Sequence, residues 1–110
     1  MTFKVFISKQ AKKDLREIYE YIAITLLSPQ NAAGQLDRLE NKIMGLSQMP
    51  MCFRKYEAEP WHSRGLRIMP VDNFVVLYIP NEEMGIVAVL RVMYGGRNVE
   101  EQLSTLNTMD

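Results

Sequence analysis

Residues 65–79 read Gly65-Leu66-Arg67-Ile68-Met69-Pro70-Val71-Asp72-Asn73-Phe74-Val75-Val76-Leu77-Tyr78-Ile79, and residues 86–94 read Ile86-Val87-Ala88-Val89-Leu90-Arg91-Val92-Met93-Tyr94. These apolar runs are rich in β-branched residues, and the turn residues between them are typical of antiparallel strands joined by tight turns. Arginines interrupt the runs at Arg67 and Arg91, and Arg97 follows a Gly-Gly pair just after the last run. An arginine inside an apolar strand is costly unless it lies at an edge or has a partner, so we expect functional residues on this sheet.

The first half of the chain predicts one strand followed by two helices. Residues 3–7 alternate as a strand does, and Ser8 then supplies a hydroxyl that can cap a helix. Ser28 and Pro29 end this helix and begin the second, with Ser28 as N-cap, and the second helix stops before Pro50. Because the connection is short, we expect an antiparallel helical hairpin. Its apolar positions follow helical spacing at Ala11, Leu15, Ile18, Tyr19, Ile22 and Leu26, and again at Ala32, Leu36, Leu39, Ile43 and Leu46.

The remaining segments complete the order β-α-α-β-β-β with a C-terminal helix. Residues 47–64 are irregular, with two prolines and scattered aromatic residues, and predict an ordered loop with at most one short strand. Asn98 and Glu101 have the spacing of a capping box, which predicts a short helix over residues 99–106. At 110 residues the chain is long enough for one core and too short for two, so we expect one α+β domain over residues 1–110.

Composition and charge exclude several classes of protein. Hydrophobic residues make up 47% and charged residues 24% of the chain, as in ordinary globular proteins. No run of about 18 apolar residues exists, so we expect no association with a membrane. The net charge is zero, which argues against direct sequence-specific binding of DNA by the chain alone. The first residues lack the apolar segment of a signal peptide, and the single cysteine, Cys52, cannot form an intramolecular disulfide, so we expect a cytoplasmic protein.

Each arginine of the sheet has a structural alternative to a functional role. Arg67 is either a contact for a phosphate or target, or a strand-edge arginine paired with Glu57, Glu59 or Asp72. By strand alternation, Arg91 shares a face with Val87, Val89 and Met93. Either that face is functional, or Arg91 pairs with an acidic residue across the sheet.

Three further residues near these strands are candidates. Arg97 follows two glycines, where the backbone is free to turn, and this favours an exposed, functional side chain. Tyr94 can act as an acid or stack on a base, or it is an amphipathic residue at a strand end. His62 is the single histidine of the chain, a residue type whose unperturbed pKa lies near neutral pH, although a lone loop histidine is more often solvated than catalytic. No zinc-ligand spacing, P-loop or GxGxxG pattern occurs, so we expect no metal and no cofactor.

Several short patterns follow one another along the chain: Phe3-Lys4-Val5-Phe6-Ile7-Ser8, Asp14-Leu15, Ile18-Tyr19-Glu20-Tyr21-Ile22, Gly65-Leu66-Arg67, Phe74-Val75-Val76-Leu77-Tyr78 and Leu90-Arg91-Val92-Met93-Tyr94-Gly95-Gly96-Arg97-Asn98. By their order and spacing the chain resembles, over residues 3–103, the RelE/ParE family of toxins from bacterial type II toxin–antitoxin modules. The resemblance implies a helical hairpin packed on a twisted, mainly antiparallel four-stranded sheet. It also implies a toxin that a cognate antitoxin neutralises.

The family divides by mechanism. RelE-like members resemble ribonucleases that cleave mRNA on the ribosome, whereas ParE-like members are understood to poison DNA gyrase without chemistry of their own. The resemblance implies that a nuclease would carry an arginine after the aromatic residue of the third sheet strand. Here Phe74 is followed by Val75, and a valine cannot bind a phosphate. The run from Arg91 to Asn98 also looks more like the ParE branch.

Two hypotheses for function follow. The first, which Val75 favours, is a toxin without enzymatic activity that binds a cytosolic target, DNA gyrase by analogy, through the helical hairpin and through Arg67, Arg91, Arg97 and Tyr94. The second is a metal-independent, ribosome-dependent mRNA endoribonuclease with Arg67, Arg97, Tyr94 and His62 as its catalytic residues. A decayed toxin without remaining activity is a third possibility.

Overall fold

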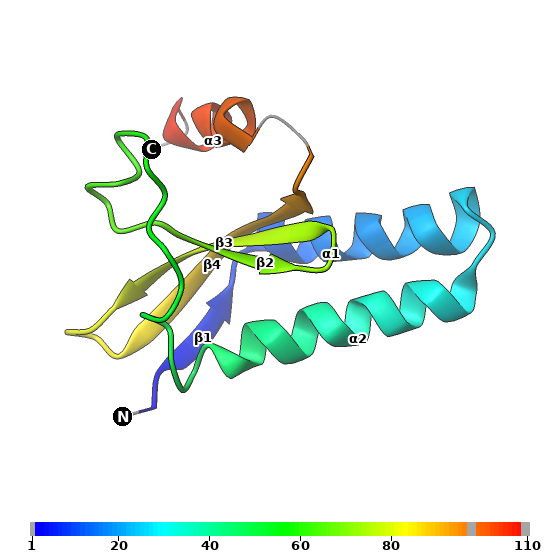
Figure 1. The fold of residues 1–110 in the computed structure, drawn as a ribbon, viewed down its shortest axis with the longest axis horizontal. Helices are drawn as coiled ribbons and strands as arrows, with labels where there is room; N and C mark the ends of the chain where they lie inside the picture. The colour runs from blue at the N-terminus through cyan, green and yellow to red at the C-terminus, as the bar shows by residue number, and fades with distance from the viewer. Residues whose placement is uncertain (1, 97–98, 109–110) are drawn as a thin grey trace.

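The secondary structure follows the predicted order in a computed structural model of the protein, which describes residues 2–96 and 99–108 (Figure 1). The first half holds β1 (Lys4–Ile7), α1 (Lys9–Glu20), the π-helical turn η1 (Tyr21–Thr25) and α2 (Pro29–Gly45). The second half holds β2 (Arg67–Val71), β3 (Phe74–Asn81), β4 (Ile86–Tyr94) and α3 (Val99–Thr108). The predicted helix over 99–106 is therefore confirmed, whereas Asn98, its expected capping residue, lies outside the described residues.

The four strands form one sheet in the order β1-β4-β3-β2. β1 runs parallel to β4, and the pairs β4–β3 and β3–β2 are antiparallel, so the prediction of a mainly antiparallel sheet is confirmed. The parallel pair joins the N-terminal strand to the centre of the sheet, and helices α1 and α2 carry the chain onward from β1. Strand β2 lies at the other edge.

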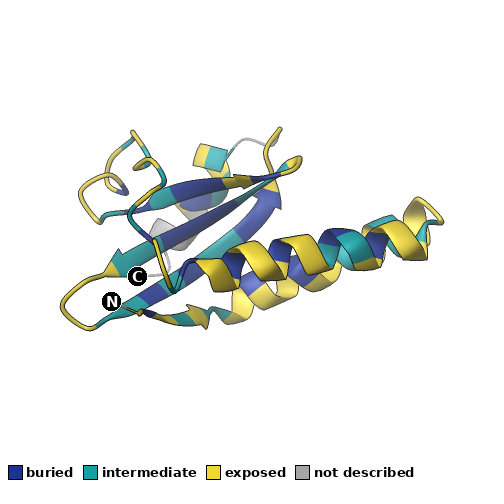
Figure 2. Cartoon of the chain, turned by 60° about the horizontal axis from the view of Figure 1, so that its bottom comes forward, coloured by how far each residue is buried: buried dark blue, intermediate teal, exposed yellow. Residues whose placement is uncertain are grey.

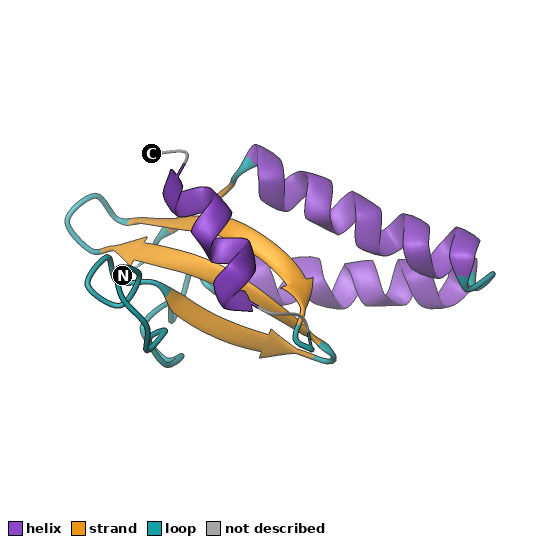
Figure 3. Cartoon of the chain, turned by 90° about the horizontal axis from the view of Figure 1, so that it is seen from above, coloured by secondary structure: helices purple, strands orange, loops and turns teal. Residues whose placement is uncertain are grey.

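The helical hairpin of α1 and α2 covers one face of the sheet and extends beyond it (Figures 1 and 3). Its apolar stripes meet alternate residues of the strands, as the spacing of three and four residues in the helices and of two in the strands requires. Buried members of this hairpin-side core include Ala11, Leu15, Leu39, Ile43, Val76, Tyr78, Val87, Val89 and Val92.

The opposite face of the sheet is covered by α3 and by the loop that precedes β2 (Figure 3). Leu103 of α3 packs there with Trp61 and Leu66 of the loop and with Leu77 and Met93 of the strands. This second cluster is smaller than the hairpin-side core. The sheet is thus the middle layer of three, and side chains on its two faces belong to different clusters.

The ends of the hairpin helices differ in part from the expectation. Ser8 caps α1 as predicted, because its Oγ accepts a hydrogen bond from the Ala11 N–H at 3.0 Å. Ser28 occupies the N-cap position of α2, with Pro29 as the first helical residue, but its side chain makes no capping hydrogen bond. Between the helices the chain passes through the π-helical turn, and Leu27 then takes a left-handed φ of 54°.

Residues 47–66 form an ordered, irregular connection, as predicted. An isolated bridge between Lys55 and Arg67 takes the place of the short strand that the sequence allowed. The Tyr78 hydroxyl donates a hydrogen bond to the Pro50 carbonyl at 2.6 Å, which holds the start of this loop against the sheet. Burial raises the pKa of the Tyr78 phenol to about 12.

The described part of the chain has no helix that combines the length and the apolar character needed to cross a bilayer. Figure 2 shows exposed residues in yellow along the outer faces of α1 and α2, at the far end of the hairpin, and in the loops before β2 and between β3 and β4.

Candidate functional site

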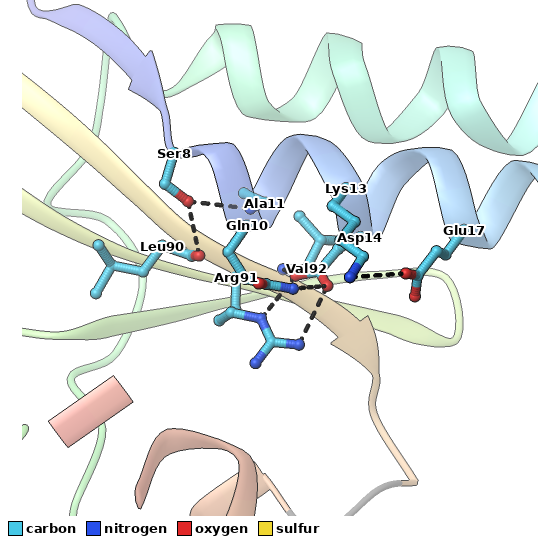
Figure 4. Close-up of polar contacts among 9 residues, drawn as sticks. All are labelled: Ser8, Gln10, Ala11, Lys13, Asp14, Glu17, Leu90, Arg91 and Val92. Atoms are coloured by element: carbon cyan, nitrogen blue, oxygen red, sulfur yellow. Dashed lines mark hydrogen bonds and ion pairs between the residues drawn. The ribbon is translucent and has the colours of Figure 1, made fainter. Parts of the chain in front are cut away.

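A buried ion pair joins helix α1 to the second half of strand β4 (Figure 4). Asp14 Oδ2 accepts a hydrogen bond from Arg91 Nε at 2.7 Å, and Asp14 Oδ1 accepts one from Arg91 Nη2 at 3.1 Å. The two side chains are only 11% and 6% exposed, for Arg91 and Asp14 respectively. The Val92 N–H donates to the same carboxylate at 3.0 Å, and Gln10 Nε2 donates to it at 3.2 Å. Asp14 is thereby saturated with hydrogen bonds.

Asp14 pairs with a part of the β4 edge that β1 does not reach. The parallel ladder between β1 and β4 stops at the pair Ile7 and Val89, so the edge of β4 beyond Val89 loses its strand partner. The first turns of α1 replace that partner. Ser8 Oγ donates to the Leu90 carbonyl at 2.9 Å, and Asp14 accepts from the Val92 N–H two residues later. The side chains of α1 therefore satisfy backbone groups that would otherwise be unpaired.

A β-bulge changes the face on which Arg91 lies. Leu77 pairs with Arg91, but the next residue, Tyr78, pairs with Val89, so Leu90 is an extra residue in β4. The predicted sharing of one face by Arg91, Val87 and Val89 is therefore wrong. Arg91 lies opposite Leu77, whose side chain belongs to the cluster under α3. The predicted acidic partner of Arg91 is confirmed, although it comes from α1 and not from a neighbouring strand.

Arg67 serves the loop that follows α2. It pairs with Tyr78 across the edge strand, which places it on the hairpin side of the sheet. Its Nη1 donates to the Phe53 carbonyl at 2.6 Å and, more weakly, to the Met51 carbonyl at 3.3 Å. Its buried Nε has no hydrogen-bond partner among the described residues. Arg67 and Arg91 therefore lie on opposite faces of the sheet.

The predicted pairing of Arg67 with an acidic side chain is wrong. Asp72 instead accepts hydrogen bonds from Arg38 Nε at 2.8 Å and from Gln35 Nε2 at 3.0 Å, and the Arg38 hydrogen bond is the main reason that the pKa of Asp72 is lowered. Glu59 accepts from the backbone N–H and the hydroxyl of Ser63, and these bonds lower its pKa.

His62 lies exposed in the loop before β2. Its backbone N–H donates to the Ala58 carbonyl at 3.0 Å. Its proximity is a minor cause of the lowered pKa of Glu59, after the hydrogen bonds from Ser63. Beside it, the Arg64 guanidinium lies 4.9 Å from the centre of the Trp61 ring. The histidine is thus part of a local surface turn.

Tyr94 and Arg91 line one groove between α1, the end of β4 and α3. The groove has a volume of about 800 Å³ and includes apolar side chains such as Phe74 and Met93 beside the charged Lys13 and Glu17. Tyr94 is 52% exposed and meets Phe74 edge to face, with the ring centres 6.1 Å apart. An amphipathic tyrosine at a strand end was one of the two predicted alternatives, and its position fits that alternative.

The predicted site residues do not form one cluster within the described part of the chain. No hydrogen bond or ion pair there joins any two of Arg67, Arg91, Tyr94 and His62. Arg97 lies outside the described residues, so its role stays a prediction.

Position 75 is a packing position. Val75 pairs with Pro70 on one side and with Met93 on the other, and it packs with the cluster under α3. A side chain at Gly95 would bring its Cβ to 3.5 Å from Val75 Cγ1, so the backbone that leaves β4 passes close to it. The position therefore provides an apolar contact where the nuclease hypothesis calls for a cation.

A family profile described as "ParE toxin of type II toxin-antitoxin system, parDE" matches residues 5–99. The chain belongs to the ParE toxin family.

Solved structures of other toxins share the fold of this ParE family member. The chromosomal ParDE toxin–antitoxin system of Pseudomonas aeruginosa aligns with a TM-score of 0.68 at 18% identity, over 84% of this chain and 96% of that one. The toxin–antitoxin complex RelBE2 of Mycobacterium tuberculosis aligns with 0.62 at 19% identity, over 86% and 99%. The archaeal RelE–RelB complex of Pyrococcus horikoshii aligns with 0.60 at 21% identity, over 88% and 99%. A comparison with curated proteins gave no significant match.

Asp14 is the residue of this ParE family member that sequence reasoning missed. Its signal was available, because Asp14 lies three residues after Ala11 and four before Ile18, on the face of α1 that turns to the sheet. A carboxylate on a buried helical face requires a partner, and an arginine in the sheet is the natural one. In the described residues no three His, Cys, Asp or Glu side chains are arranged to hold a metal ion.

Proposed function

We propose that this ParE family member inhibits growth by binding a cytosolic protein target, DNA gyrase by analogy with its family, and that a cognate antitoxin neutralises it. The observation that carries the proposal is the environment of position 75, where a nuclease of this family would carry an arginine. Val75 is an apolar residue that packs with the cluster under α3.

Cleavage of RNA next to its 2′-OH needs groups that activate the hydroxyl, stabilise the charge on phosphorus and protonate the leaving oxygen. These groups must converge on one space. Of the described nuclease candidates, Arg67 donates to loop carbonyls on the hairpin side, Tyr94 lines the groove beside α3, and His62 lies exposed in the loop before β2. The described residues thus lack the convergence that a nuclease needs, and this favours binding over catalysis.

An antitoxin partner is supported by the structural relatives, which are toxin–antitoxin systems or complexes. The groove beside α3 gives such a partner a place to bind, because it combines apolar side chains with Lys13, Glu17 and Tyr94 at its edge. An amphipathic segment that folds on binding suits such a surface.

The experiment separates target binding from RNA cleavage in two parallel assays. Purified toxin is titrated into a DNA gyrase supercoiling reaction and, separately, into a ribosome-dependent translation extract whose mRNA ends are mapped. Inhibited supercoiling with intact mRNA is the expected result. Specific mRNA cleavage with unaffected gyrase would overturn the proposal and establish the ribosome-dependent endoribonuclease.

Tyr94→Phe is the matched variant for the alternative function. It keeps the ring packed against Phe74 and removes only the exposed hydroxyl. A nuclease that uses Tyr94 as an acid would lose cleavage in this variant, whereas target binding would lose little. In both assays, prior addition of the protein encoded next to the toxin gene should restore the uninhibited reaction.

A further inference from the structure

The far end of the helical hairpin exposes an unusual amount of apolar surface. We call residues 21–36 the hairpin tip; it comprises η1, the turn to α2 and the first turns of α2. Ile24 is 68% and Leu27 83% exposed, and Tyr21 and Leu26 are more than half exposed. Figure 2 shows this end as a projection beyond the sheet, largely in yellow. Ile24, Leu26 and Leu27 follow one another closely at this protruding end, and Tyr21 at its base also lines the groove beside α3.

The backbone of the tip holds these side chains outward, and at Leu27 this requires an unfavourable backbone conformation. The Leu26 N–H donates to the Tyr21 carbonyl across the π-helical turn, and the Ser28 N–H donates to the Ile22 carbonyl, each at 3.0 Å. Leu27 closes this turn with a φ of 54°, a conformation that glycine or asparagine adopts more easily. Because Leu27 is 83% exposed, its side chain buries little surface within the fold and is available to a partner outside it.

The charges in and beside the hairpin tip restrict the class of partner that can bind there. From Tyr21 to Leu36 the chain contains no Asp, Glu, Lys or Arg, and the first charged residue on each side, Glu20 and Asp37, is acidic. A nucleic acid needs cations at its phosphates, and the tip supplies none. Glu20 is ion-paired with Arg16 at 3.6 Å, so Asp37 is the flanking carboxylate that an anionic bilayer surface would repel and that two copies meeting tip to tip would bring together.

We propose that the hairpin tip is a projection that inserts into an apolar pocket of the protein target, a pocket whose rim is basic. Depletion of charge at the centre with exposed aromatic and aliphatic anchors is the composition of an interface core, and the acidic Asp37 beside the tip complements a basic rim. The inference rests on the proposed function, because it names the surface through which the toxin reaches its target.

The test compares a tip variant with a matched control. The double variant Ile24→Gln, Leu27→Asn replaces two exposed apolar side chains, and asparagine suits the backbone of position 27, so the fold is kept. The control is Met84→Gln, which changes a similarly exposed residue (70%) in the turn between β3 and β4. Circular dichroism and urea unfolding establish that both variants are folded.

The expected result is inhibition of gyrase supercoiling that is at least about tenfold weaker for the double variant and unchanged for Met84→Gln, with unchanged binding of the antitoxin. Charge reversal by Asp37→Lys should also weaken inhibition. Full inhibition by the double variant would overturn the inference and leave the proposed function standing.

Growth arrest on expression decides the inference if the wild-type protein does not inhibit gyrase. Loss of arrest in the double variant but not in Met84→Gln would support target docking through the tip, whereas retained arrest would overturn it. Three other results would overturn the inference in favour of a different occupant of the tip. The first two are binding to phosphatidylcholine–phosphatidylglycerol vesicles, or a dimer in sedimentation, that the wild type shows and the double variant loses. The third is a double variant that binds the antitoxin more weakly but keeps full toxicity.

Discussion

The two ends of the α1–α2 hairpin are held in opposite ways. At the sheet end, Asp14 and Ser8 bind backbone and side-chain groups of β4, and Arg67 and Tyr78 bind the chain that leaves α2. At the hairpin tip there is no charged side chain, and Tyr21, Ile24, Leu26 and Leu27 are exposed. One end uses long-range polar contacts to fix the helices on the sheet, and the other leaves apolar surface free.

This difference shows that residue type is a poor guide to role in a small domain. The arginines of the sheet are residues that usually contact phosphates or targets, yet Arg67 and Arg91 are hydrogen-bonded within the fold. Ile24 and Leu27 are residues that usually fill a core, yet they are on the surface. The comparison predicts large stability losses for changes at the sheet end and small or reversed effects at the tip.

Asp14→Ala is expected to have the largest effect. It leaves the Arg91 guanidinium without its partner at a site where that side chain is 11% exposed, and it leaves the Val92 N–H without an acceptor. Breaking one side of a buried pair costs about 3–5 kcal/mol of unfolding free energy. Urea unfolding followed by circular dichroism measures the loss.

Two further variants show whether that loss comes from the orphaned charge. Glu17→Ala breaks the pair with Lys13, whose side chains are 56% and 59% exposed, and should cost no more than about 1 kcal/mol. The double change Asp14→Leu, Arg91→Met removes both charges and should recover much of the stability. A loss below about 1 kcal/mol for Asp14→Ala would show that the sheet end is not held by this pair.

Tyr78 makes the sheet end sensitive to alkaline pH. Its pKa is raised by burial from 10.0 to about 12. Because the unfolded phenol ionises first, the stabilising contribution is complete below pH 10 and is lost as the pH rises through 12, up to about 3 kcal/mol. The difference in stability between the wild type and Tyr78→Phe, measured from pH 8 to 12, isolates this group from other titrating residues. A constant difference across that range would contradict the shift.

Arg67→Met is expected to act on stability and not on the target. The change removes the donor to the Phe53 and Met51 carbonyls while keeping much of the apolar stem. Hydrogen bonds from charged groups contribute about 1.5–3 kcal/mol, so a loss in that range is expected in urea unfolding. Inhibition of gyrase per folded molecule should be unchanged. Lost inhibition at full stability would move Arg67 to the target surface.

The order of the elements could be predicted because most elements have a recognisable pattern of apolar residues within their own sequence. Alternation in residues 3–7, the continuous apolar run of residues 74–79 and the helical spacing on either side of Ser28 are local signals, and tertiary packing did not override them. The polar signal at Ser8 was also local, because an N-cap needs only the residues that follow it.

The site could be predicted less well because its geometry depends on single-residue shifts. The extra Leu90 in β4 leaves no mark on composition, yet it separates Arg91 from the face of Val87 and Val89. The acceptors of Arg67 are backbone carbonyls, which any sequence supplies, so no side-chain pattern could identify them. The π-helical turn continues the apolar spacing of α1, so periodicity does not distinguish it from a longer α-helix.

Leu27→Asn is expected to have the smallest effect, with the opposite sign. Asparagine tolerates the left-handed φ of 54° better than leucine, and the lost side chain is 83% exposed, so unfolding free energy should rise by about 0.5–1 kcal/mol. Leu27→Ala keeps the unfavourable backbone conformation and should give no such gain. A loss of stability in Leu27→Asn would mean that the tip packs against the chain itself. A gain in stability together with weaker inhibition of the target would instead show that leucine at this position serves binding at the expense of the fold, as in the contrast between the two ends of the hairpin.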